Sequence, residues 1–440
     1  MTAVRQVDVL VVGAGPAGLA AAARLATAGA GRVEVLERET RPGGVPRHCA
    51  HGGFGTWTRP LTGPRYAHLL AAAAERAGAV IRTRTTVLDW EVAAVPGANT
   101  LLTVGPGGPE ALGARAVVLA TGARERPRAA RLVPGTRPAG VYTTGELQQA
   151  VHLFGQRIGT RAVVVGARDV SYAAARTVRT AGAEVVALVT EHPRARTSPA
   201  RARSARLVQG IPLLTGTTVT ELLGHGRLSG VRVRHRDGRT TVLPCDTVVF
   251  TGDFVPDHEL ARRGALDLDP GTRGPAVHTA LHTSRPGVFA AGNLLHAVEP
   301  AGTAAREGAR AAGAVLGHLA GAPWPHPGIP VTVESPLRWI TPNRLTPDLL
   351  TPNLLTPGRV DPNGPGPDRR HPAAAPPPPH LLRIDAPLPR PVLYVHQDGR
   401  LLHRARLGPL TAQPHRTLTL GVSWHGRVDP EGGEVRVSAG

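Results

Sequence analysis

The sequence predicts an α/β protein made of two βαβ units, the second inserted in the first, followed by a small all-β C-terminal domain after a Pro-rich insertion. Three observations predict this arrangement: a glycine-rich turn between an apolar run and an alanine-rich stretch, a second turn of the same design, and short alternating segments near the C-terminus. The predicted bounds are 1–145 with 245–322 for the first, discontinuous domain, 146–244 for the second, 323–340 with 380–440 for the β domain, and 341–379 for the Pro-rich linker.

The first turn is Gly13-Ala14-Gly15-Pro16-Ala17-Gly18, and an acidic residue, Glu37, ends the next apolar run. In a Rossmann-like dinucleotide-binding domain, the first glycine makes the tight turn, the second lets the backbone approach a pyrophosphate, and the third lets the helix pack close to the strand. An acidic side chain about 20 residues further on accepts hydrogen bonds from a ribose. We therefore expect the adenosine half of FAD or NAD here, with a helix from about residue 16 to 28.

Composition limits the alternatives. The net charge is +19, but the 51 basic residues are all arginine, which points to codon bias, and the aromatic content is only 3%. Scattered arginines without clustered aromatics or a known module argue against specific nucleic-acid binding. The absence of lysine excludes Schiff-base chemistry on a lysine of this chain.

Only two cysteines are present, Cys49 and Cys245. They are too few for a disulfide framework, an iron–sulfur cluster or a zinc site, so we expect no metal and a reducing compartment. The chain enters its first strand without a signal peptide, and no apolar run approaches the ~20 residues that span a bilayer. A soluble, cytoplasmic protein is expected.

The remaining elements of the first two units follow from apolar runs and turn residues. A turn at Pro42-Gly43-Gly44 precedes a loop that contains His48, Cys49 and His51. A buried strand ends at Thr121-Gly122, and the same strand end is repeated at Thr251-Gly252. Predicted helices cover about 63–77, 170–181 and 303–320, and predicted strands cover 80–84, 86–90, 101–104, 117–123, 162–165, 185–189, 231–235, 240–243, 246–252 and 288–293.

Residues 341–356 repeat Thr-Pro-x-x-Leu, and 361–379 end in four prolines. A period of five fits neither helix nor strand, and proline removes backbone donors, so this segment is expected to be extended and largely disordered. Alternation then predicts strands at 381–384, 392–396, 400–406, 418–422 and 434–437, with a hairpin turn at 397–399.

In this order the motifs resemble the pyridine nucleotide-disulfide oxidoreductase superfamily, flavoproteins with two dinucleotide-binding domains, over roughly residues 5–322. The run 43–55 with 291–295 is most similar to companion flavoproteins of glycerol-3-phosphate and 2-hydroxyacid dehydrogenases, and to the α-type subunits of opine, sarcosine and cyanide-forming glycine oxidases. The resemblance implies that FAD lies across the first domain and that the second is of the NAD(P)H-binding type.

The FAD contacts that the motifs and the resemblance imply fall in the glycine turn, the acidic strand end and the two later turns. At Asn293 the family usually has aspartate; the amide oxygen can still accept from a ribityl hydroxyl, but a charge is lost. The helix near Thr303 is expected to aim its amides at the pyrimidine edge of the flavin. The expected residues are Gly13, Gly15, Pro16, Ala17, Gly18, Glu37, Arg38, Gly44, Val87, Ala120, Thr121, Gly122, Gly292, Asn293, Gly302 and Thr303.

The catalytic candidates are His48, Cys49, His51 and His296. Aligned on Gly43-Gly44, the redox dithiol of the disulfide reductases is absent, because Pro46 and His51 stand in its place. Cys49 is a lone redox thiol, a flavin charge-transfer donor or simply a small buried residue. His48 and His51 are candidate general bases or polar loop residues. His296, with Glu299, is a similar candidate or a turn-forming residue, and Cys245 is expected to be structural.

The candidate NAD(P) residues are Gly166, Arg168, Ser171 and Glu191. Arg168 and Ser171 replace the second and third glycines, so a side chain opposes close approach of a pyrophosphate, and Asp169 adds negative charge. Arg168 could itself grip a phosphate, and Glu191 stands at the ribose position. NAD(P)H binding is therefore left open.

These expectations combine into an FAD-dependent oxidoreductase that takes two electrons from an amine, an amino acid derivative or a hydroxy acid, directly or through a partner subunit. The alternatives are an NAD(P)H-dependent reductase serving a partner dehydrogenase, and a flavin-binding scaffold without turnover. The β domain would suit a partner interface, and a homo-oligomer is compatible with the sequence.

Overall fold

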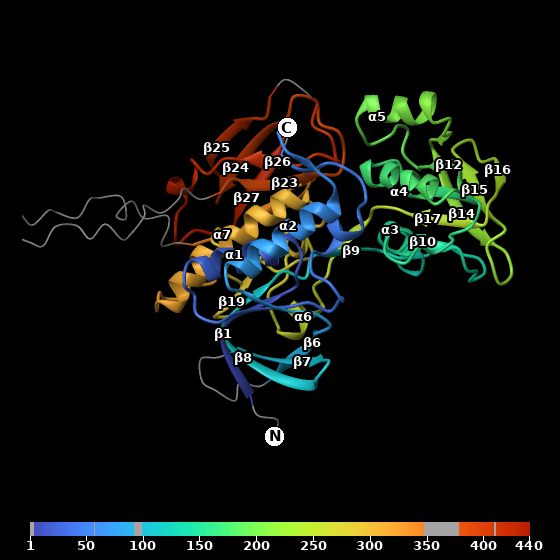
Figure 1. Ribbon diagram of the computed structural model, residues 1–440. Helices are drawn as coiled ribbons and strands as arrows, with labels where there is room; N and C mark the ends of the chain where they lie inside the picture. The colour runs from blue at the N-terminus through green and yellow to red at the C-terminus, as the bar shows by residue number, and fades with distance from the viewer. Residues whose placement is uncertain (1–3, 57, 92–98, 347–377, 409–410) are drawn as a thin grey trace, which may run out of the picture.

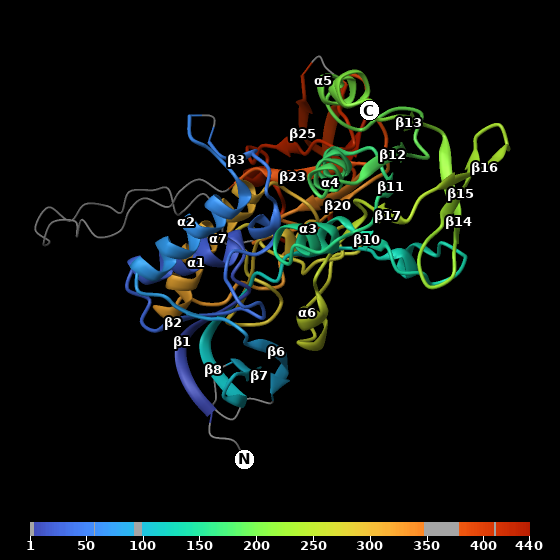
Figure 2. The same cartoon turned by 45° about the vertical axis from the view of Figure 1, so that its right-hand side comes forward.

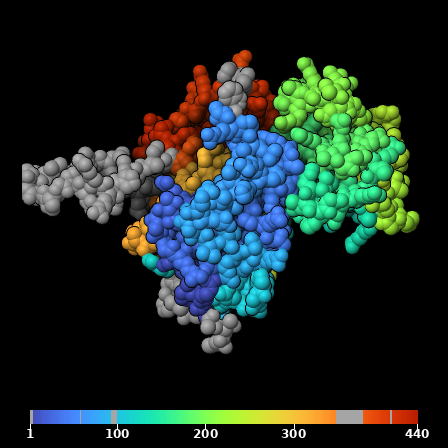
Figure 3. Space-filling view, viewed as in Figure 1, coloured from blue at the N-terminus to red at the C-terminus, as the bar shows by residue number. Residues whose placement is uncertain are grey.

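The computed structural model describes residues 4–56, 58–91, 99–346, 378–408 and 411–440. In Figure 1 a blue-to-orange part lies at the centre, a green part at the right and a red C-terminal part above. The same grouping is seen in the rotated view of Figure 2 and in the space-filling view of Figure 3. Of the segment 341–379 that was expected to be disordered, residues 347–377 lie outside the described residues, whereas residues 341–346 are ordered and include a strand at 344–345, which corrects the start of that segment.

The central part is built on a seven-stranded sheet in the order β5-β2-β1-β8-β7-β6, with β19 also paired to β8. β1, β2, β5, β8 and β19 pair with one another in parallel, whereas β7 pairs antiparallel with both β8 and β6. Apolar runs form its parallel strands because both faces are covered by side chains, which make up two buried core clusters. The strands are β1 (Val4–Val12), β2 (Val33–Leu36), β5 (Val80–Arg82), β6 (Thr86–Glu91), β7 (Asn99–Gly105), β8 (Gly108–Leu119) and β19 (Val288–Ala290).

The three long helices of the central part are α1 (Pro16–Thr27), α2 (Gly63–Arg76) and α7 (Ala301–Leu319). α1 and α7 pack very closely, because a Cβ added at Gly308 would lie 1.9 Å from the carbonyl oxygen of Ala17. The predicted strand at 80–84 ends at Arg82, since Arg84 has a positive φ of 54° that ends extended pairing. α7 begins two residues earlier than predicted, directly after Pro300.

The green part is built on a parallel sheet of order β10-β17-β11-β12-β13. An antiparallel sheet of β14, β15 and β16 packs beside it, and of these only the last two were predicted. Helix α3 was also missed, although Thr143 and Glu146 form a capping box at its start. The elements are β10 (Val141–Thr143), α3 (Thr144–His152), β11 (Arg161–Val165), α4 (Asp169–Thr180), β12 (Glu184–Val189), β13 (Leu213–Leu214), β14 (Thr217–Leu223), β15 (Gly230–His235), β16 (Thr240–Pro244) and β17 (Thr247–Phe250).

Two chain segments connect the central and green parts, and they pair as antiparallel strands β9 (Ala123–Glu125) and β18 (Phe254–Pro256). The shorter elements complete the description of these parts. They are η1 (Val45–His48), β3 (Phe54–Gly55), β4 (Pro60–Leu61), η2 (Arg128–Arg131), α5 (Pro199–Arg203), the π-helical turn η3 (Ser204–Val208), α6 (Glu259–Arg263) and η4 (Gly292–Leu294).

The C-terminal part holds two sheets, of order β22-β20-β27-β24-β25 and β21-β23-β26, around a core that includes the fully buried Trp424. The predicted hairpin joins β24 and β25 through Asp398 and Gly399, whose φ angles of 48° and 79° suit a tight hairpin turn. Its elements are β20 (Ile329–Val333), β21 (Leu337–Thr341), β22 (Arg344–Leu345), β23 (His380–Ile384), β24 (Val392–Gln397), β25 (Arg400–Arg406), β26 (Leu418–Leu420), η7 (His425–Arg427) and β27 (Val435–Ala439).

Candidate functional site

The first glycine loop has one open face. A Cβ at Gly13, where φ is 104°, would lie 2.5 Å from the Ala120 carbonyl oxygen, and a Cβ at Gly18 would lie 1.9 Å from the Gly13 carbonyl oxygen. A Cβ at Gly15 would meet nothing within 4 Å. The outer glycines are therefore required by packing of the protein itself, whereas Gly15 leaves space beside the N-terminus of α1, which starts at Pro16. This geometry fits a dinucleotide pyrophosphate.

Two later turns close around this loop. The Gly43 amide donates to the Ala14 carbonyl at 2.8 Å, and a Cβ at Gly44 would lie 2.9 Å from the Gly15 Cα. A Cβ at Gly292, with φ 76°, would lie 2.6 Å from the Cβ of Ala17. Segments far apart in sequence are thus brought to the first turn of α1 by positions that only glycine fills without strain.

Glu37 directly follows β2 and is buried. Its two carboxylate oxygens accept from the backbone amides of Ala14 and Glu39, each at 2.9 Å. Each oxygen retains acceptor capacity, so the carboxylate is held in place and can still accept from a ribose hydroxyl. Arg38 beside it is largely exposed and lies 3.8 Å from the carboxylate of Asp257.

The strand end at Ala120, Thr121 and Gly122 is tied to the second crossover. The Thr121 hydroxyl donates to the Asp257 carbonyl at 2.7 Å, and the Asp257 amide donates to the Gly122 carbonyl at 2.8 Å. Val87, from β6, packs against the core of the central sheet. The structure therefore places these residues in structural contacts, and their contact with a flavin stays a prediction.

Asn293 closes a turn. Its side-chain oxygen accepts from the Glu299 amide at 2.9 Å, and its side-chain nitrogen donates to the Glu299 carbonyl at 3.1 Å. A ribityl hydroxyl would have to use the remaining lone pair of the amide oxygen. The turn delivers the chain to Pro300 and to the first turn of α7, where Gly302 and Thr303 line the main cavity.

Glu299 receives a partner that the sequence did not reveal. Arg383, from β23 in the C-terminal part, forms an ion pair with its carboxylate, and the two side chains are only 14% and 4% exposed. The Thr417 hydroxyl also donates to this carboxylate. No periodic pattern could connect residues this far apart in sequence, so only the tertiary structure identifies the pair.

His296 lies away from the cavity. It is fully buried, its Nε2 lies 2.9 Å from both carboxylate oxygens of Glu307, and its ring stacks on Trp339 at 5.9 Å. Burial is the largest single influence and opposes the charged form, but the carboxylates of Glu307 and Glu299 together raise the pKa of His296. Glu307 also accepts from the Gly292 amide at 3.1 Å. These contacts favour the turn-forming role over direct catalysis for His296.

The loop after Gly44 places His48, Cys49 and His51 at the cavity wall. Burial raises the pKa of the Cys49 thiol to about 12, so the thiol stays protonated, and its Sγ lies 3.4 Å from the side-chain oxygen of Gln148. This favours the small buried residue over a redox thiol. Burial lowers the pKa of His48 to about 4, and its Nε2 has no partner among the described residues. His51 is half-buried, with Nδ1 2.7 Å from the Gly52 carbonyl oxygen.

The cavity has a volume of about 2190 Å³ and is lined by all three parts of the molecule. Its walls bring His48, Cys49 and His51 together with the start of α7 and with the second loop. Of the expected cofactor residues, Arg38, Gly302, Thr303, Gly166, Arg168 and Glu191 line it, whereas the first glycine loop, Glu37, Ser171 and the Gly292 turn do not.

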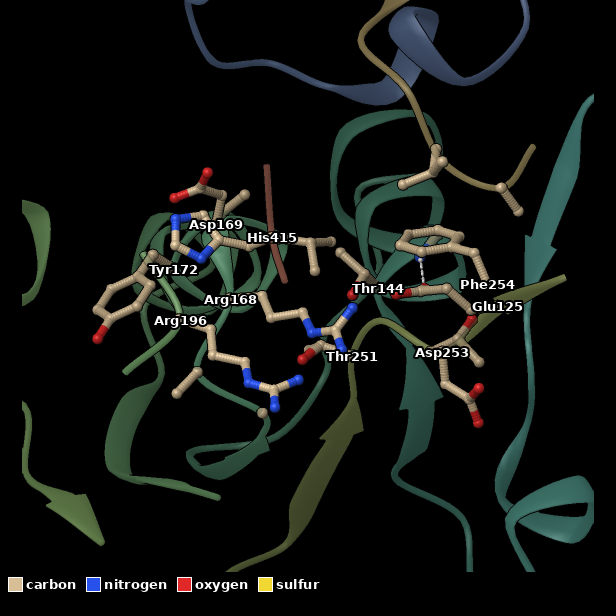
Figure 4. A pocket seen from close by; sticks show the side chains of 18 of the residues that line it. Glu125, Thr144, Arg168, Asp169, Tyr172, Arg196, Thr251, Asp253, Phe254 and His415 are labelled. Carbon is tan, nitrogen blue, oxygen red and sulfur yellow. Dashed lines mark hydrogen bonds between the residues drawn. The ribbon is translucent and has the colours of Figure 1, made fainter. Parts of the chain in front are cut away.

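The second loop contributes Arg168 to the cavity wall, and Thr251 lies close to it (Figure 4). Ser171 is fully buried, and its Oγ accepts from the Arg168 amide at 3.1 Å and lies 2.6 Å from the Thr251 hydroxyl. A Cβ at Gly166 would lie 2.2 Å from that same hydroxyl. The Arg168 amide, near the expected pyrophosphate position, therefore already donates its hydrogen bond to Ser171.

The acidic residues of this loop differ from expectation. Asp169 forms an ion pair with Arg201 and accepts a hydrogen bond from the Thr197 hydroxyl. Its charge is therefore compensated, which contradicts the expectation that Asp169 would repel a bound anion. Glu191 is mostly exposed, with His192 Nε2 3.8 Å away. Nothing in the described structure holds Glu191 as the backbone holds Glu37.

Glu125, at the crossover between the two parts, was not predicted. It accepts from the backbone amides of Gly252 at 2.8 Å and Gly145 at 3.1 Å, and burial raises its pKa. It lines the cavity near Cys49. Among the described residues there is no group of three or more His, Cys, Asp or Glu that could hold a metal ion, and no described helix is long and apolar enough to cross a membrane.

Comparison with known proteins identifies a family and several relatives of this chain. The family profile described as "Pyridine nucleotide-disulphide oxidoreductase" matches residues 7–308. The alpha chain of sarcosine oxidase from Corynebacterium sp. (strain P-1) is 32% identical over 72% of the chain and 30% of its own length. An opine oxidase subunit of Rhizobium meliloti is 30% identical over 65% of the chain and 58% of its length. The chain thus spans less than two thirds of these relatives.

Shorter relatives are covered almost completely. Thioredoxin reductase of Mycolicibacterium smegmatis is 30% identical over 69% of the chain and 94% of its own length. Among solved structures, thioredoxin reductase of T. acidophilum superposes with a TM-score of 0.59 at 25% identity, covering 71% of the chain and 98% of that structure. The mixed α/β fold with Rossmann-like sheets is therefore shared with these proteins.

Proposed function

Because the chain belongs to the pyridine nucleotide-disulphide oxidoreductase family, whose members bind FAD and NAD(P)H, we propose that it is the flavin-bearing subunit of an FAD-dependent oxidoreductase. Its electron donor is an amine, an amino acid derivative or a hydroxy acid, directly or through a partner subunit. We also propose the domain bounds 1–145 with 245–322 for FAD, 146–244 for the inserted domain, and 323–340 with 380–440 for the C-terminal domain.

The observation that carries the choice of donor is the closed second loop. Ser171 occupies the Arg168 amide and the Thr251 hydroxyl, and Arg168 stands where a glycine would let a pyrophosphate approach. The loop is therefore a poor binding site for a nicotinamide dinucleotide. A disulfide as the reaction partner is also disfavoured, since Cys49 and Cys245 are free, buried cysteines and neither has a second cysteine as partner. The names of the sarcosine and opine oxidase relatives support an amine or amino acid derivative.

The residues fit FAD in three places. The open face of Gly15 takes the pyrophosphate, the fixed carboxylate of Glu37 accepts from the adenosine ribose, and the N-terminus of α7 faces the flavin ring. When bound, FAD supplies the two-electron acceptor. Two histidines of the loop after Gly44 line the cavity: His48 is neutral near pH 7 with a buried, unpartnered Nε2, and half-buried His51 is the more accessible proton acceptor.

The test is an anaerobic titration of the flavin-loaded protein, first with NADH and NADPH, then with a panel of amines, amino acid derivatives and hydroxy acids. The expected result is retention of the oxidised flavin absorbance with both nicotinamides and its loss with one organic donor. Reduction by dithionite is the control that the flavin is accessible. Rapid bleaching by NADH or NADPH would contradict the proposal.

A second candidate is an NAD(P)H-dependent reductase serving a partner dehydrogenase. Near-complete coverage of thioredoxin reductase and of the ferredoxin–NADP reductase of Salinispora tropica, 94% and 86% of their lengths, favours it. It requires the second loop to open. A flavin that dithionite reduces but that no nicotinamide or organic donor bleaches would instead support a scaffold without turnover.

A further inference from the structure

One wall of the cavity carries two arginines at the second loop. An isolated parallel bridge pairs the backbones of Arg168 and Arg196, and the Arg196 amide donates to the Ala167 carbonyl at 2.8 Å. In Figure 4 the two guanidinium groups lie near each other, and Asp169 points away from them. Arg338, Arg383 and Arg416 add further arginines from the C-terminal part to the lining of the same cavity.

Most carboxylates along this wall have other partners. The exception is Glu191, which is mostly exposed with only His192 beside it; its charge and that of Asp385 partly offset the effect of burial on the pKa of Arg196. Asp253 lies 3.1 Å from Arg126, and Asp385 lies 3.9 Å from Arg338. Asp169 is paired with Arg201, and Glu299 is paired with Arg383. Within the described ranges, no carboxylate lies within 4.0 Å of either Arg168 or Arg196.

Both guanidinium groups are partly withdrawn from water. Burial lowers the pKa of Arg168, and the positive charges of Arg196, Arg338 and Arg383 lower it further. Burial also lowers the pKa of Arg196. Arginine nevertheless keeps its proton in proteins, so this cluster of like charges is an electrostatic cost that a bound anion would relieve.

We propose that Arg168 and Arg196 form a binding site for a small dianion or polyanion that carries phosphate or carboxylate groups. The planar guanidinium binds such groups through two parallel hydrogen bonds, so two side chains replace the backbone amides of an ordinary nucleotide loop. Because Ser171 and Thr251 close that loop, the site recognises the anionic group without a dinucleotide. The inference goes beyond the proposed function, since binding requires no electron transfer.

The experiment is isothermal titration calorimetry of the flavin-loaded full chain with pyrophosphate and, separately, citrate, at constant ionic strength. The two probes distinguish a phosphate-type from a carboxylate-type ligand. Arg168→Met, which keeps the aliphatic length, and Arg196→Met are each expected to weaken binding tenfold or more. The matched control is Arg239→Met, because Arg239 is an exposed arginine of the same part, paired to Asp237 at 2.7 Å.

Retained flavin absorbance and thermal unfolding midpoint show that each variant is folded. The proposal is overturned if neither probe binds, if Arg239→Met weakens binding as much as Arg168→Met, or if NADP⁺ binds more tightly than pyrophosphate and Arg168→Met leaves its affinity unchanged. Failure of the proposed function is read separately, from flavin bleaching by NADH or NADPH.

Discussion

The two glycine loops of the chain follow the same strand-to-helix path but differ in what fills them. Gly13 and Gly166 both have positive φ, 104° and 130°, so the tight turn is kept in each. After it, Gly15 leaves open space, whereas Arg168 fills the same position and has its amide bonded to Ser171. A βαβ unit thus keeps its fold when the binding glycines are lost, because only the first glycine is required by the turn itself.

The acidic residues that follow the two loops show the same contrast. Glu37 is buried and fixed by two backbone amides, whereas Glu191 is mostly exposed beside His192. A carboxylate that the backbone orients loses less conformational entropy when it binds a ribose than one that is free in solvent. The backbone therefore orients the acidic residue of the first unit, whereas that of the second unit is not fixed in the described structure.

The largest effect is expected from Gly18→Ala. Its Cβ would lie 1.9 Å from the Gly13 carbonyl oxygen, so α1 must move, at a cost of roughly 3 kcal/mol, and flavin content should fall sharply. The matched variant Gly15→Ala has nothing within 4 Å of its Cβ and should keep the unfolding midpoint while losing flavin affinity. Thermal unfolding and bound-flavin absorbance separate the two effects. If both variants lowered the unfolding midpoint equally, the distinction between a packing glycine at 18 and a binding glycine at 15 would be wrong.

A smaller effect is expected from Glu37→Gln, which offers one amide nitrogen where the Ala14 and Glu39 amides both need an acceptor. We expect a loss of roughly 1–3 kcal/mol in stability of the flavin-loaded protein. Glu191→Gln, at the corresponding exposed position, should change it by less than ~0.5 kcal/mol. Urea unfolding measures both. An equal loss in both variants would show that the two acids are not distinguished by burial.

The double variant Arg168→Gly/Ser171→Gly tests whether glycines at these two positions open the second loop to a nicotinamide dinucleotide. Removing both side chains frees the loop amide, and flavin reduction by NADH or NADPH should become at least about tenfold faster, which is equivalent to ~1.4 kcal/mol. Stopped-flow bleaching is the measurement. Thr180→Ser, at the far end of α4, is the control, and no gain in the double variant would mean that more than the loop blocks the site.

The smallest effect concerns pH. Burial lowers the pKa of His48 to about 4 in the folded chain, so the unfolded chain binds more protons between that value and about 6.5. Stability from this group is complete above about pH 6.5 and is lost as pH falls, by about 1 kcal/mol between pH 6.5 and 5.5. His48→Asn should flatten this part of the stability curve, measured by urea unfolding at several pH values. His51→Asn, at a half-buried residue with no comparable burial, is the control.

Much of the central part could be predicted because its signals are local. The apolar run before Gly13, the glycines and the acid at residue 37 specify the strand, the helix and a buried carboxylate within one short segment. Helix α3 was missed because its capping box precedes few apolar residues, and β14 because its alternation is weak. The Arg383–Glu299 and His296–Glu307 pairs could not be predicted, since polar pairing across the fold leaves no periodic trace in the sequence.

The Arg383–Glu299 pair also bears on how separable the C-terminal part is. Its arginine lies on β23, whereas its carboxylate belongs to the turn that delivers α7 to the cavity. Replacing Arg383 alone, with the C-terminal part in place, would leave that buried carboxylate without its cation, a situation that typically costs roughly 3–5 kcal/mol. The C-terminal sheets therefore stabilise the entrance to α7, and exchanging them for those of a relative would require the arginine to be carried along.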